Sequence, residues 1–356
     1  MDTKPGFGLL GTGLVAPFHA KSLINSKKAK LIAAVDIDPK RLKAFCEEYD
    51  CRAYATLEEM LGDDRISVVN VLTPNHLHFD AVMACAAAGK HVLVEKPPAM
   101  SLKDTDIMIR ACRDHGVKFG VSLQCRVRKA VQAVKRAIDS GRFGRLLHAD
   151  AFMKWYRSPD YYHSDAWRSS RRFGAGVTIQ HAFHYIDLLY YLAGSVKSVQ
   201  AQMSNLAHPD VRLEDTLLAF LEFSNGARGV VEASTAFWPG TELRIEINGT
   251  DGNAIIVGER IETWKFKDEQ PEDETIRNIG SAEILTGASG PADFAYFDHQ
   301  AVIEDMVEAI QMQREPIIAV PLARGTLEIA LAMYKSAREN SVIYLPLENE
   351  SNIWDE

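Results

Sequence analysis

The sequence predicts an α/β domain with a parallel sheet, followed by an α+β domain with a large, mostly antiparallel open sheet. In residues 5–125, short apolar runs alternate with helical patterns, which is typical of parallel strands covered on both faces. Beyond residue 144, long stretches alternate residue by residue, as in 242–247, which is typical of strands with one covered face. The expected domains are 1–125 and 126–356.

The first domain is expected to contain parallel strands joined by helices. The apolar runs are 7–10, 31–35, 66–72, 91–94 and 117–122, and the helical patterns are 15–26, 40–49, 76–88 and 102–115. Ligands of such sheets bind beyond the carboxyl ends of the strands. Polar residues that follow these strands are therefore the first candidates for a binding site.

The second domain follows a helical pattern at 128–139 and a glycine-containing turn at 140–144. Candidate strands are 145–157, 196–206, 214–223, 228–237, 242–249, 252–257 and 261–266. One helix, 177–189, interrupts them, and 267–296 is expected to be a long loop. Helical patterns at 302–310 and 327–334 are the last elements expected. Packing of the last helix against the first domain stays open. The broad open face of the sheet is expected to join copies into a homodimer or homotetramer.

Composition excludes several classes of protein. The 356 residues carry a formal net charge of −8, which argues against nucleic-acid and anionic-membrane partners. No apolar run approaches the roughly 18 residues of a membrane span, and the N-terminus lacks a secretion signal. The five cysteines form no C-x-x-C pair, so reduced thiols in the cytoplasm and no metal site are expected.

The stretch 7–16 combines an apolar run with a turn of small residues. Gly11 permits a tight strand-to-helix turn, Gly13 lets a pyrophosphate approach the backbone, and Ala16 lets the helix pack closely. The following helix N-terminus favours phosphate groups.

The next apolar run ends in Asp36, 20 residues after the last small residue of the turn. A carboxylate there accepts hydrogen bonds from the adenosine ribose and repels a 2′-phosphate, and Ile37 follows it. NAD is therefore favoured over NADP, although Lys40 and Arg41 keep NADP open as the less favoured coenzyme. Asp38 precedes a proline and is expected to cap the next helix.

Three further strand ends carry polar residues. The first has Thr73, Pro74 and Asn75, with Asn75 able to cap the helix whose first turn contains His78. The second, 95–98, presents a lysine between an acid and two prolines that fix the backbone. A nearby nicotinamide cation would favour the neutral amine of that lysine, which could then share in proton transfer with a substrate hydroxyl. The third, 124–126, ends the sheet.

The helix 177–189 places Gln180, His184 and Asp187 on one face, with His181 beside that face. Imidazole titrates near neutral pH, so His184 is a natural acid or base for alcohol oxidation, and Asp187 is expected to orient its ring. A buried structural histidine is the alternative. The segment 154–168 is dense in aromatic and cationic residues, which suit either a polyhydroxylated ligand or simple packing.

Together these motifs resemble the glucose–fructose oxidoreductase and inositol dehydrogenase (Gfo/Idh/MocA) family over nearly the whole chain. The resemblance rests on the glycine turn, Thr73-Pro74-Asn75, Glu95-Lys96-Pro97, the turn 174–176 with His184, and Trp155-Tyr156-Arg157. It implies a Rossmann domain and an open antiparallel sheet that often forms oligomers. It also implies NAD(P)-dependent oxidation or reduction of a sugar or cyclitol carbon.

The resemblance also implies residue roles. Lys96 and His184 would be catalytic. The dinucleotide would be lined by Gly11, Thr12, Gly13, Leu14, Asp36, Ile37, Thr73, Pro74, Asn75, His78, Glu95, Lys96 and Gln124, with Trp167 and Arg168 near the nicotinamide and the substrate. The substrate would contact Lys96, Tyr156, Arg157, Gln180, His181 and His184. Many relatives carry aspartate where this chain has Gln180, which shifts weight from the histidine to the lysine.

The expected function is an NAD-dependent dehydrogenase of a sugar, sugar derivative or cyclitol. Two alternatives stay open. One is a glycosidase or lyase that oxidises its substrate transiently and regenerates NAD, and net NADH release distinguishes it. The other is a non-catalytic regulator that binds NAD and a sugar, against which the intact lysine and histidine argue.

Overall fold

The computed structural model describes residues 4–174, 176–280, 295–351 and 353–354, which fold into two compact units. The first unit comprises Met1–Gln124 and Ala295–Arg324, and the second comprises Cys125–Phe294 and Gly325–Glu356. A segment near the C-terminus therefore belongs to the first unit. None of the described helices is both long and apolar enough to cross a membrane.

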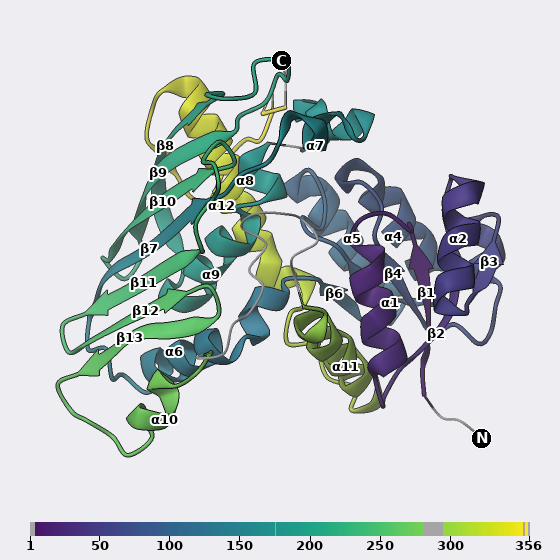
Figure 1. The fold of residues 1–356 in the computed structure, drawn as a ribbon, viewed down its shortest axis with the longest axis horizontal. Helices are drawn as coiled ribbons and strands as arrows, with labels where there is room; N and C mark the ends of the chain where they lie inside the picture. Colours follow the sequence, from purple (N-terminus) through teal and green to yellow (C-terminus); the bar gives the residue numbers. More distant parts are fainter. Residues whose placement is uncertain (1–3, 175, 281–294, 352, 355–356) are drawn as a thin grey trace. The chain divides into compact units, whose positions relative to one another are not determined.

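The first unit is built on a six-stranded parallel sheet (Figure 1), which confirms the predicted α/β class. Its strand order is β3-β2-β1-β4-β5-β6. The bounds are β1 Gly6–Leu10, β2 Lys30–Val35, β3 Arg52–Tyr54, β4 Val68–Val71, β5 His91–Val94 and β6 Phe119–Val121. The short edge strand β3 was not predicted, because three residues carry too little periodicity to be recognised.

Helices connect these strands. They are α1 Ala16–Asn25, α2 Pro39–Tyr49, α3 Leu57–Leu61, α4 His78–Ala87 and α5 Leu102–Asp114, and α11 Phe297–Gln311 also belongs to this unit. Asp38 caps α2 as predicted, because its Oδ1 accepts the backbone N–H groups of Lys40 and Arg41 at 2.9 and 3.2 Å. The capping role expected for Asn75 is wrong. That residue lies within a 3-10 turn, Asn75–Leu77, and no side-chain cap is seen at α4 among the described residues.

The second unit contains an eight-stranded sheet of order β13-β12-β11-β7-β10-β9-β8-β14. Its strands are β7 Leu146–Lys154, β8 Val196–Ser204, β9 Thr216–Phe223, β10 Arg228–Ser234, β11 Arg244–Gly249, β12 Gly252–Val257, β13 Arg260–Phe266 and β14 Ile343–Tyr344. Strands β7 and β10 pair in parallel, and every other pair is antiparallel. The mostly antiparallel sheet is therefore confirmed.

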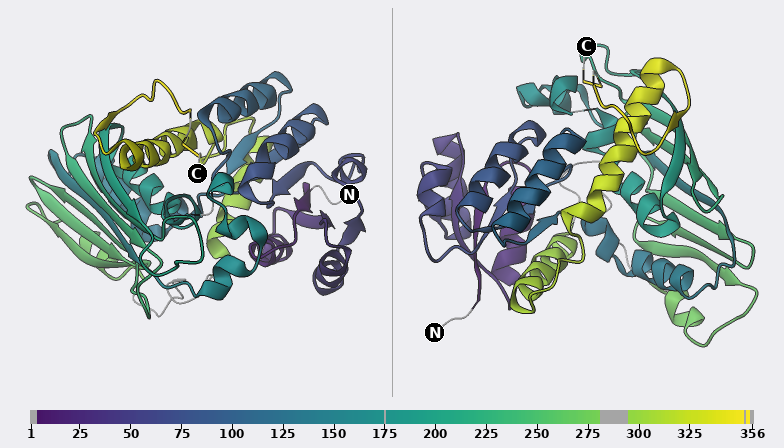
Figure 2. Two further views of the ribbon diagram at one scale, coloured as in Figure 1. Left: turned by 90° about the horizontal axis from the view of Figure 1, so that it is seen from above. Right: turned by 180° about the vertical axis from the view of Figure 1, so that it is seen from behind.

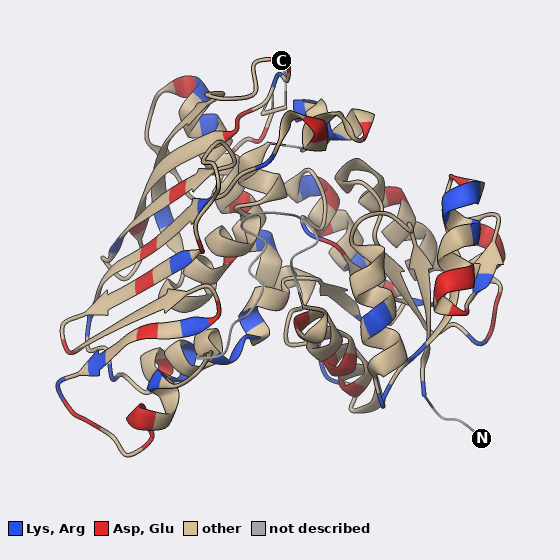
Figure 3. Cartoon of the chain, in the orientation of Figure 1, with Lys and Arg blue, Asp and Glu red and all other residues tan. Residues whose placement is uncertain are grey.

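Helices cover one face of this sheet, as both views in Figures 1 and 2 show. They include α6 Lys129–Asp139, α8 Val177–Gln180, α9 Phe183–Ala193 and α12 Val320–Glu339, while α7 Pro159–His163 and α10 Asp273–Arg277 are short. In β9, Leu217, Ala219 and Leu221 are buried, whereas Leu218 and Phe220 are 47% and 65% exposed. Acidic and basic residues are interspersed along the strands (Figure 3). The exposed side of β9 therefore has an apolar part.

The predicted continuous helix 177–189 is wrong. The chain forms α8 and α9, which are separated at His181, where φ is −121° and ψ is −52°. The break lies where the His181 ring packs against Tyr161 and Trp155, with ring centroids 5.5 and 6.4 Å away. The expected loop 267–296 contains α10, and its part 281–294 lies outside the described residues.

Candidate active site

The glycine turn after β1 has the predicted backbone. Gly11 has φ +101° and donates its N–H to the Val35 carbonyl at 2.8 Å, and a Cβ there would meet the Leu72 carbonyl oxygen at 3.0 Å. A Cβ on Gly13 would instead face open space, with no described atom within 4 Å. Ala16 is fully buried. The turn therefore leaves the backbone at Gly13 open to a phosphate group.

The N-terminus of α1 is suited to an anion. Among the described residues, no side chain caps it at Val15, and its first turn contains no acidic residue. The partial positive charge of the helix end is therefore not neutralised locally. The neighbouring Leu14 is 41% exposed. These features fit the pyrophosphate of a dinucleotide.

Asp36 is a buried, charged acceptor at the end of β2. Its Oδ2 accepts the N–H and hydroxyl of Thr12 at 2.7 and 2.8 Å, and its Oδ1 accepts the N–H of Asp38 at 2.9 Å. Burial raises the pKa of this carboxyl, but the hydrogen bonds from Arg41, Asp38 and Thr12 outweigh burial and lower the pKa. Ile37 beside it is 97% exposed.

Arg41 already binds this carboxylate. Its Nη2 donates to Asp36 Oδ1 at 2.6 Å and its Nε donates to Oδ2 at 3.2 Å. Ribose hydroxyls would need the same oxygens, so Arg41 must share them or move when a dinucleotide binds. The guanidinium is also a partner for a 2′-phosphate, so it bears directly on the choice between NAD and NADP.

Buried polar atoms gather at the carboxyl ends of β4 and β6. Asn70 Oδ1, Thr73 Oγ1, Ser122 Oγ and Gln124 Oε1 are buried and have no hydrogen-bond partner among the described residues. Leaving a buried polar atom unsatisfied is costly, so such atoms call for a partner. A ligand rich in amide and hydroxyl groups, such as the nicotinamide half of NAD, would supply partners there.

Glu95, which follows β5, lies in a buried network that sequence reasoning missed. His19 of α1 contacts Glu95 Oε1 through Nε2 at 3.0 Å and Asn70 Nδ2 through Nδ1 at 2.9 Å. The Lys96 N–H donates to Glu95 Oε2 at 3.3 Å. Burial raises the pKa of Glu95, but His19, His299 and Lys96 outweigh it and bring the pKa to about 2. The carboxylate is therefore charged, and it holds the backbone of the candidate lysine.

His19, Glu95 and His299 also place one ligand atom each within 4.8 Å of one another, a spacing that could hold a metal ion. His19 already contacts Glu95 Oε1 through Nε2 and the Asn70 amide through Nδ1. Both nitrogens of His19 are thus used in hydrogen bonds, and the expectation that no metal is bound stays a prediction.

His78 links two of the predicted coenzyme loops. Its ring is fully buried, with Nδ1 2.8 Å from the Pro97 carbonyl oxygen and Nε2 2.9 Å from the Thr73 carbonyl oxygen. Burial lowers its pKa. The ring therefore ties the loop after β4 to the loop after β5, and Lys96 stands in the second of these loops.

The second unit contains a cluster of aromatic rings and guanidinium groups. The Arg157 guanidinium lies 5.1 Å from the Trp155 ring centroid and 5.8 Å from that of Tyr161, and the Arg157 side chain is almost fully buried. The Arg168 guanidinium lies 4.9 Å from the Tyr161 ring centroid and 4.6 Å from that of Trp167. Its Nη1 also donates a hydrogen bond to the Tyr161 hydroxyl at 3.0 Å. Rings and cations of this kind suit a ligand with sugar and anionic groups.

A buried His208–Asp215 pair, also missed from the sequence, supports Arg157. His208 Nδ1 lies 2.9 Å from Asp215 Oδ2, and Nε2 lies 2.8 Å from the Arg157 carbonyl oxygen. Burial lowers the pKa of His208, but the bonds to these two acceptors outweigh it and raise the pKa. Both ring nitrogens face acceptors, so the charged imidazolium is the form that satisfies this geometry. No sequence motif predicts the His208–Asp215 pair.

The prediction that Asp187 orients His184 is wrong. Asp187 is fully buried and accepts two hydrogen bonds from Arg126, at 2.7 and 2.5 Å, and one from the Thr326 hydroxyl at 2.7 Å. Gln180 ends α8 and His184 is the second residue of α9, so the break also separates the two residues expected on one helix face. The roles of Gln180, His181 and His184 stay predictions.

Comparison with known proteins agrees with these features. The oxidoreductase family with an NAD-binding Rossmann fold matches residues 6–123, and the GFO/IDH/MocA C-terminal domain matches residues 131–255. A crystal structure of the WlbA dehydrogenase from Bordetella pertussis, in complex with NADH and UDP-GlcNAcA, is 31% identical, with a TM-score of 0.89, over 98% of this chain and 99% of that one.

Two curated relatives act on smaller molecules. A scyllo-inositol 2-dehydrogenase (NAD(+)) of Bacillus subtilis is 26% identical over 98% of both chains. A 2,7-anhydro-N-acetylneuraminate hydratase of Mediterraneibacter gnavus is 27% identical over 80% of this chain and 78% of its own. The chain belongs to the GFO/IDH/MocA family of oxidoreductases with an NAD-binding Rossmann fold.

Proposed function

We propose that this protein is an NAD-dependent dehydrogenase whose substrate is a nucleotide-linked sugar acid of the kind represented by UDP-GlcNAcA. The observation that carries this proposal is the 31% identity, over 98% of the chain, to the WlbA dehydrogenase bound to NADH and UDP-GlcNAcA. The Arg157 and Arg168 cluster supports it, because the sugar carboxylate is a natural partner for guanidinium groups.

The first unit would hold the coenzyme. The pyrophosphate would meet the Gly13 backbone and the α1 N-terminus, the ribose would meet Asp36, and the nicotinamide half would meet the polar strand ends. Bound NAD supplies a hydride acceptor. Other predicted lining residues, among them Leu14, Ile37, Pro74 and Gln124, would complete this site.

Lys96 would take the proton of the reacting hydroxyl. The buried carboxylate of Glu95 fixes its backbone, and His78 ties its loop to the loop after β4. A positioned base of this kind contributes roughly 10²–10⁴-fold to the rate, and holding the substrate in place contributes more. His184 and Tyr156 of the second unit would orient the sugar, with His184 as a second acid or base.

A substrate panel tests the proposal. The full-length protein with NAD is assayed for NADH absorbance with UDP-GlcNAcA, UDP-GlcNAc, scyllo-inositol and levoglucosan. We expect kcat/KM for UDP-GlcNAcA to exceed that for UDP-GlcNAc at least about tenfold, because the second lacks the carboxylate partner of the arginines. A preference for scyllo-inositol would overturn the substrate class and leave NAD-dependent oxidation standing.

The hydratase relative favours one alternative reaction, in which oxidation is transient and NAD is regenerated. Chromatography of the product alongside the NADH assay separates the two. Substrate consumption without accumulation of NADH would support the alternative, and one NADH per product would exclude it.

We also propose that copies of this chain associate through the open face of the large sheet as a homodimer or homotetramer. The exposed Leu218 and Phe220, with Tyr344 on β14 at 65% exposure, supply an apolar surface for the contact. The cytoplasm is the proposed location, because all five cysteines are free thiols.

A further inference from the structure

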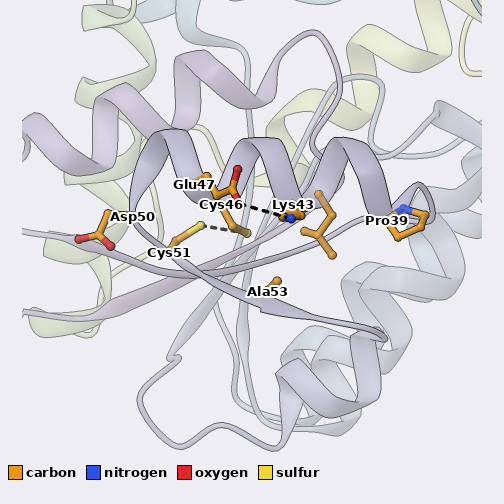
Figure 4. A pocket seen from close by; sticks show the side chains of 8 residues that line it. Pro39, Lys43, Cys46, Glu47, Asp50, Cys51 and Ala53 are labelled. Atoms are coloured by element: carbon orange, nitrogen blue, oxygen red, sulfur yellow. Dashed lines mark hydrogen bonds and ion pairs between the residues drawn. The ribbon is translucent and has the colours of Figure 1, made fainter.

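We propose that Cys46 and Cys51 form a redox modification site, at which oxidants of the disulfide class link the two residues in an intramolecular disulfide. The Sγ atoms lie 3.5 Å apart. Figure 4 shows the two side chains pointing toward each other, one from the last turn of α2 and one from the segment just before β3. This inference is independent of the substrate proposed above.

The local backbone brings the two thiols together. Asp50 follows α2 in the left-handed region, with φ 48° and ψ 58°, and the Cys51 N–H donates to the Cys46 carbonyl at 3.2 Å. The chain therefore reverses direction directly after the helix. A disulfide needs its sulfurs at about 2.05 Å, so the pair must close by roughly 1.5 Å, at a surface turn rather than in a packed core.

Accessibility distinguishes this pair from the other thiols. Cys46 and Cys51 are partly exposed, whereas Cys85, Cys112 and Cys125 are buried, with at most 3% exposure. The pair lines a surface pocket of about 400 Å³ that also includes Pro39, Lys43, Asp50 and Ala53. A small disulfide such as glutathione disulfide can therefore reach this pair before any other cysteine.

Cys46 is the attacking thiol. Burial raises the pKa of both thiols, but the hydrogen bond that Cys51 donates to Cys46 Sγ partly offsets this for Cys46 and further raises the pKa of Cys51. The thiolate is the nucleophile in exchange, so the thiol that ionises more readily reacts first. Cys51 then resolves the mixed disulfide.

The reaction balances in two exchanges. The Cys46 thiolate attacks one sulfur of glutathione disulfide, whose S–S bond breaks, and the released glutathione thiolate takes up the proton that Cys46 lost. Cys51 then loses its proton and attacks the Cys46 sulfur, which releases the second glutathione as a thiol. Two protein thiols are oxidised to one disulfide, and one glutathione disulfide is reduced to two glutathione molecules.

Peptide mapping of the full-length protein tests the proposal. The protein is incubated with glutathione disulfide, unfolded, alkylated and digested with trypsin, which yields residues 44–52 as one peptide containing both cysteines. We expect this peptide to lose two hydrogen atoms, to resist alkylation, and to be restored by dithiothreitol. The other three cysteines should be recovered as alkylated thiols. Recovery of Cys46 and Cys51 as free thiols, or as stable glutathione adducts, would overturn the proposal.

Two variants test the order of attack. In Cys51→Ser the mixed disulfide cannot be resolved, so a glutathione adduct on Cys46 should accumulate at least about tenfold above the wild-type level. In Cys46→Ser, adduct formation on Cys51 should be at least about tenfold slower. Equal reactivity of the two variants would contradict the assignment of Cys46 as the attacking thiol. The peptide map of the wild-type protein tests whether the disulfide forms, and it does not depend on the folding of the variants.

Discussion

Lys96 is the residue on which turnover is expected to depend. Lys96→Ala should retain NAD binding and reduce kcat at least about tenfold, because the proton acceptor is lost while the glycine turn and Asp36 are untouched. Coenzyme affinity by fluorescence titration and kcat by NADH absorbance give the two readouts. Lys103→Ala, an exposed lysine on α5, is the control. Unchanged kcat in Lys96→Ala would rule out the proposed role.

Asp36 and Arg41 set a prediction about coenzyme choice. Asp36→Ala should shift the ratio of NAD to NADP affinity toward NADP by about tenfold or more, because it removes a repelling carboxylate and releases a guanidinium for the 2′-phosphate. Asp64→Ala, at an exposed site in the same unit, should leave the ratio unchanged. Equal ratios for Asp36→Ala and the wild type would show that this carboxylate does not select the coenzyme.

Some residue roles could be predicted from the sequence, and others could not. Gly11, Gly13 and Asp36 could be assigned from spacing, because turn chemistry and strand ends are local properties. The partner of Asp187 could not be assigned, because Arg126 lies 61 residues away in the sequence and reaches the carboxylate only in the folded chain. The helical spacing between His184 and Asp187 predicted a contact between them, but the spacing does not account for Arg126, which binds Asp187 instead.

At the scale of elements, His19 joins α1 to β4 and to the loop after β5. His19→Ala should destabilise the protein by about 1–3 kcal/mol, because the buried Glu95 carboxylate and the Asn70 amide each lose a hydrogen-bond partner. Urea unfolding measures the change, and Lys21→Ala, an exposed position on the same helix, is the control. Equal midpoints for the two variants would show that the network contributes little to stability.

The His208–Asp215 pair joins the segment before β9 to the backbone of Arg157, and it predicts a pH dependence. The folded-state pKa of His208 is raised above its usual 6.5, so its contribution to stability is fully present below pH 6.5 and is lost as pH rises through the raised value. His208→Gln should therefore lower the Tm most below pH 6.5.

Thermal unfolding of wild type and His208→Gln across pH 6–9 checks this, with His148→Gln, at a side chain that is 54% exposed, as the control. The Tm difference between wild type and His208→Gln should shrink as pH rises. A difference that stays constant across the range would mean that His208 is not charged in the folded protein.

At the scale of the whole molecule, the open sheet predicts assembly. Phe220→Glu should convert an oligomer into a monomer, because it places charge on an apolar surface that is to be buried between copies. Light scattering coupled to size-exclusion chromatography measures the mass. Leu206→Glu, a similarly exposed residue outside the strands, should leave the mass unchanged. A monomeric wild type would remove the proposal.

The sequence by itself determined the parallel sheet, the mostly antiparallel sheet and the polar strand ends of the first unit. These follow from residue periodicity and turn chemistry, which act over a few neighbouring positions. It also indicated the coenzyme, through the glycine turn and Asp36.

Only the tertiary structure decided which buried charges meet. Glu95 and His19 are 76 residues apart, Asp187 and Arg126 are 61 residues apart, and the contact of His208 with the Arg157 carbonyl spans 51 residues. The break at His181 has the same origin, since aromatic contacts with Trp155 and Tyr161 accompany the departure from the local helical pattern. A buried charge is costly in free energy unless it is paired, and the tertiary fold rather than the local sequence places the partner beside it.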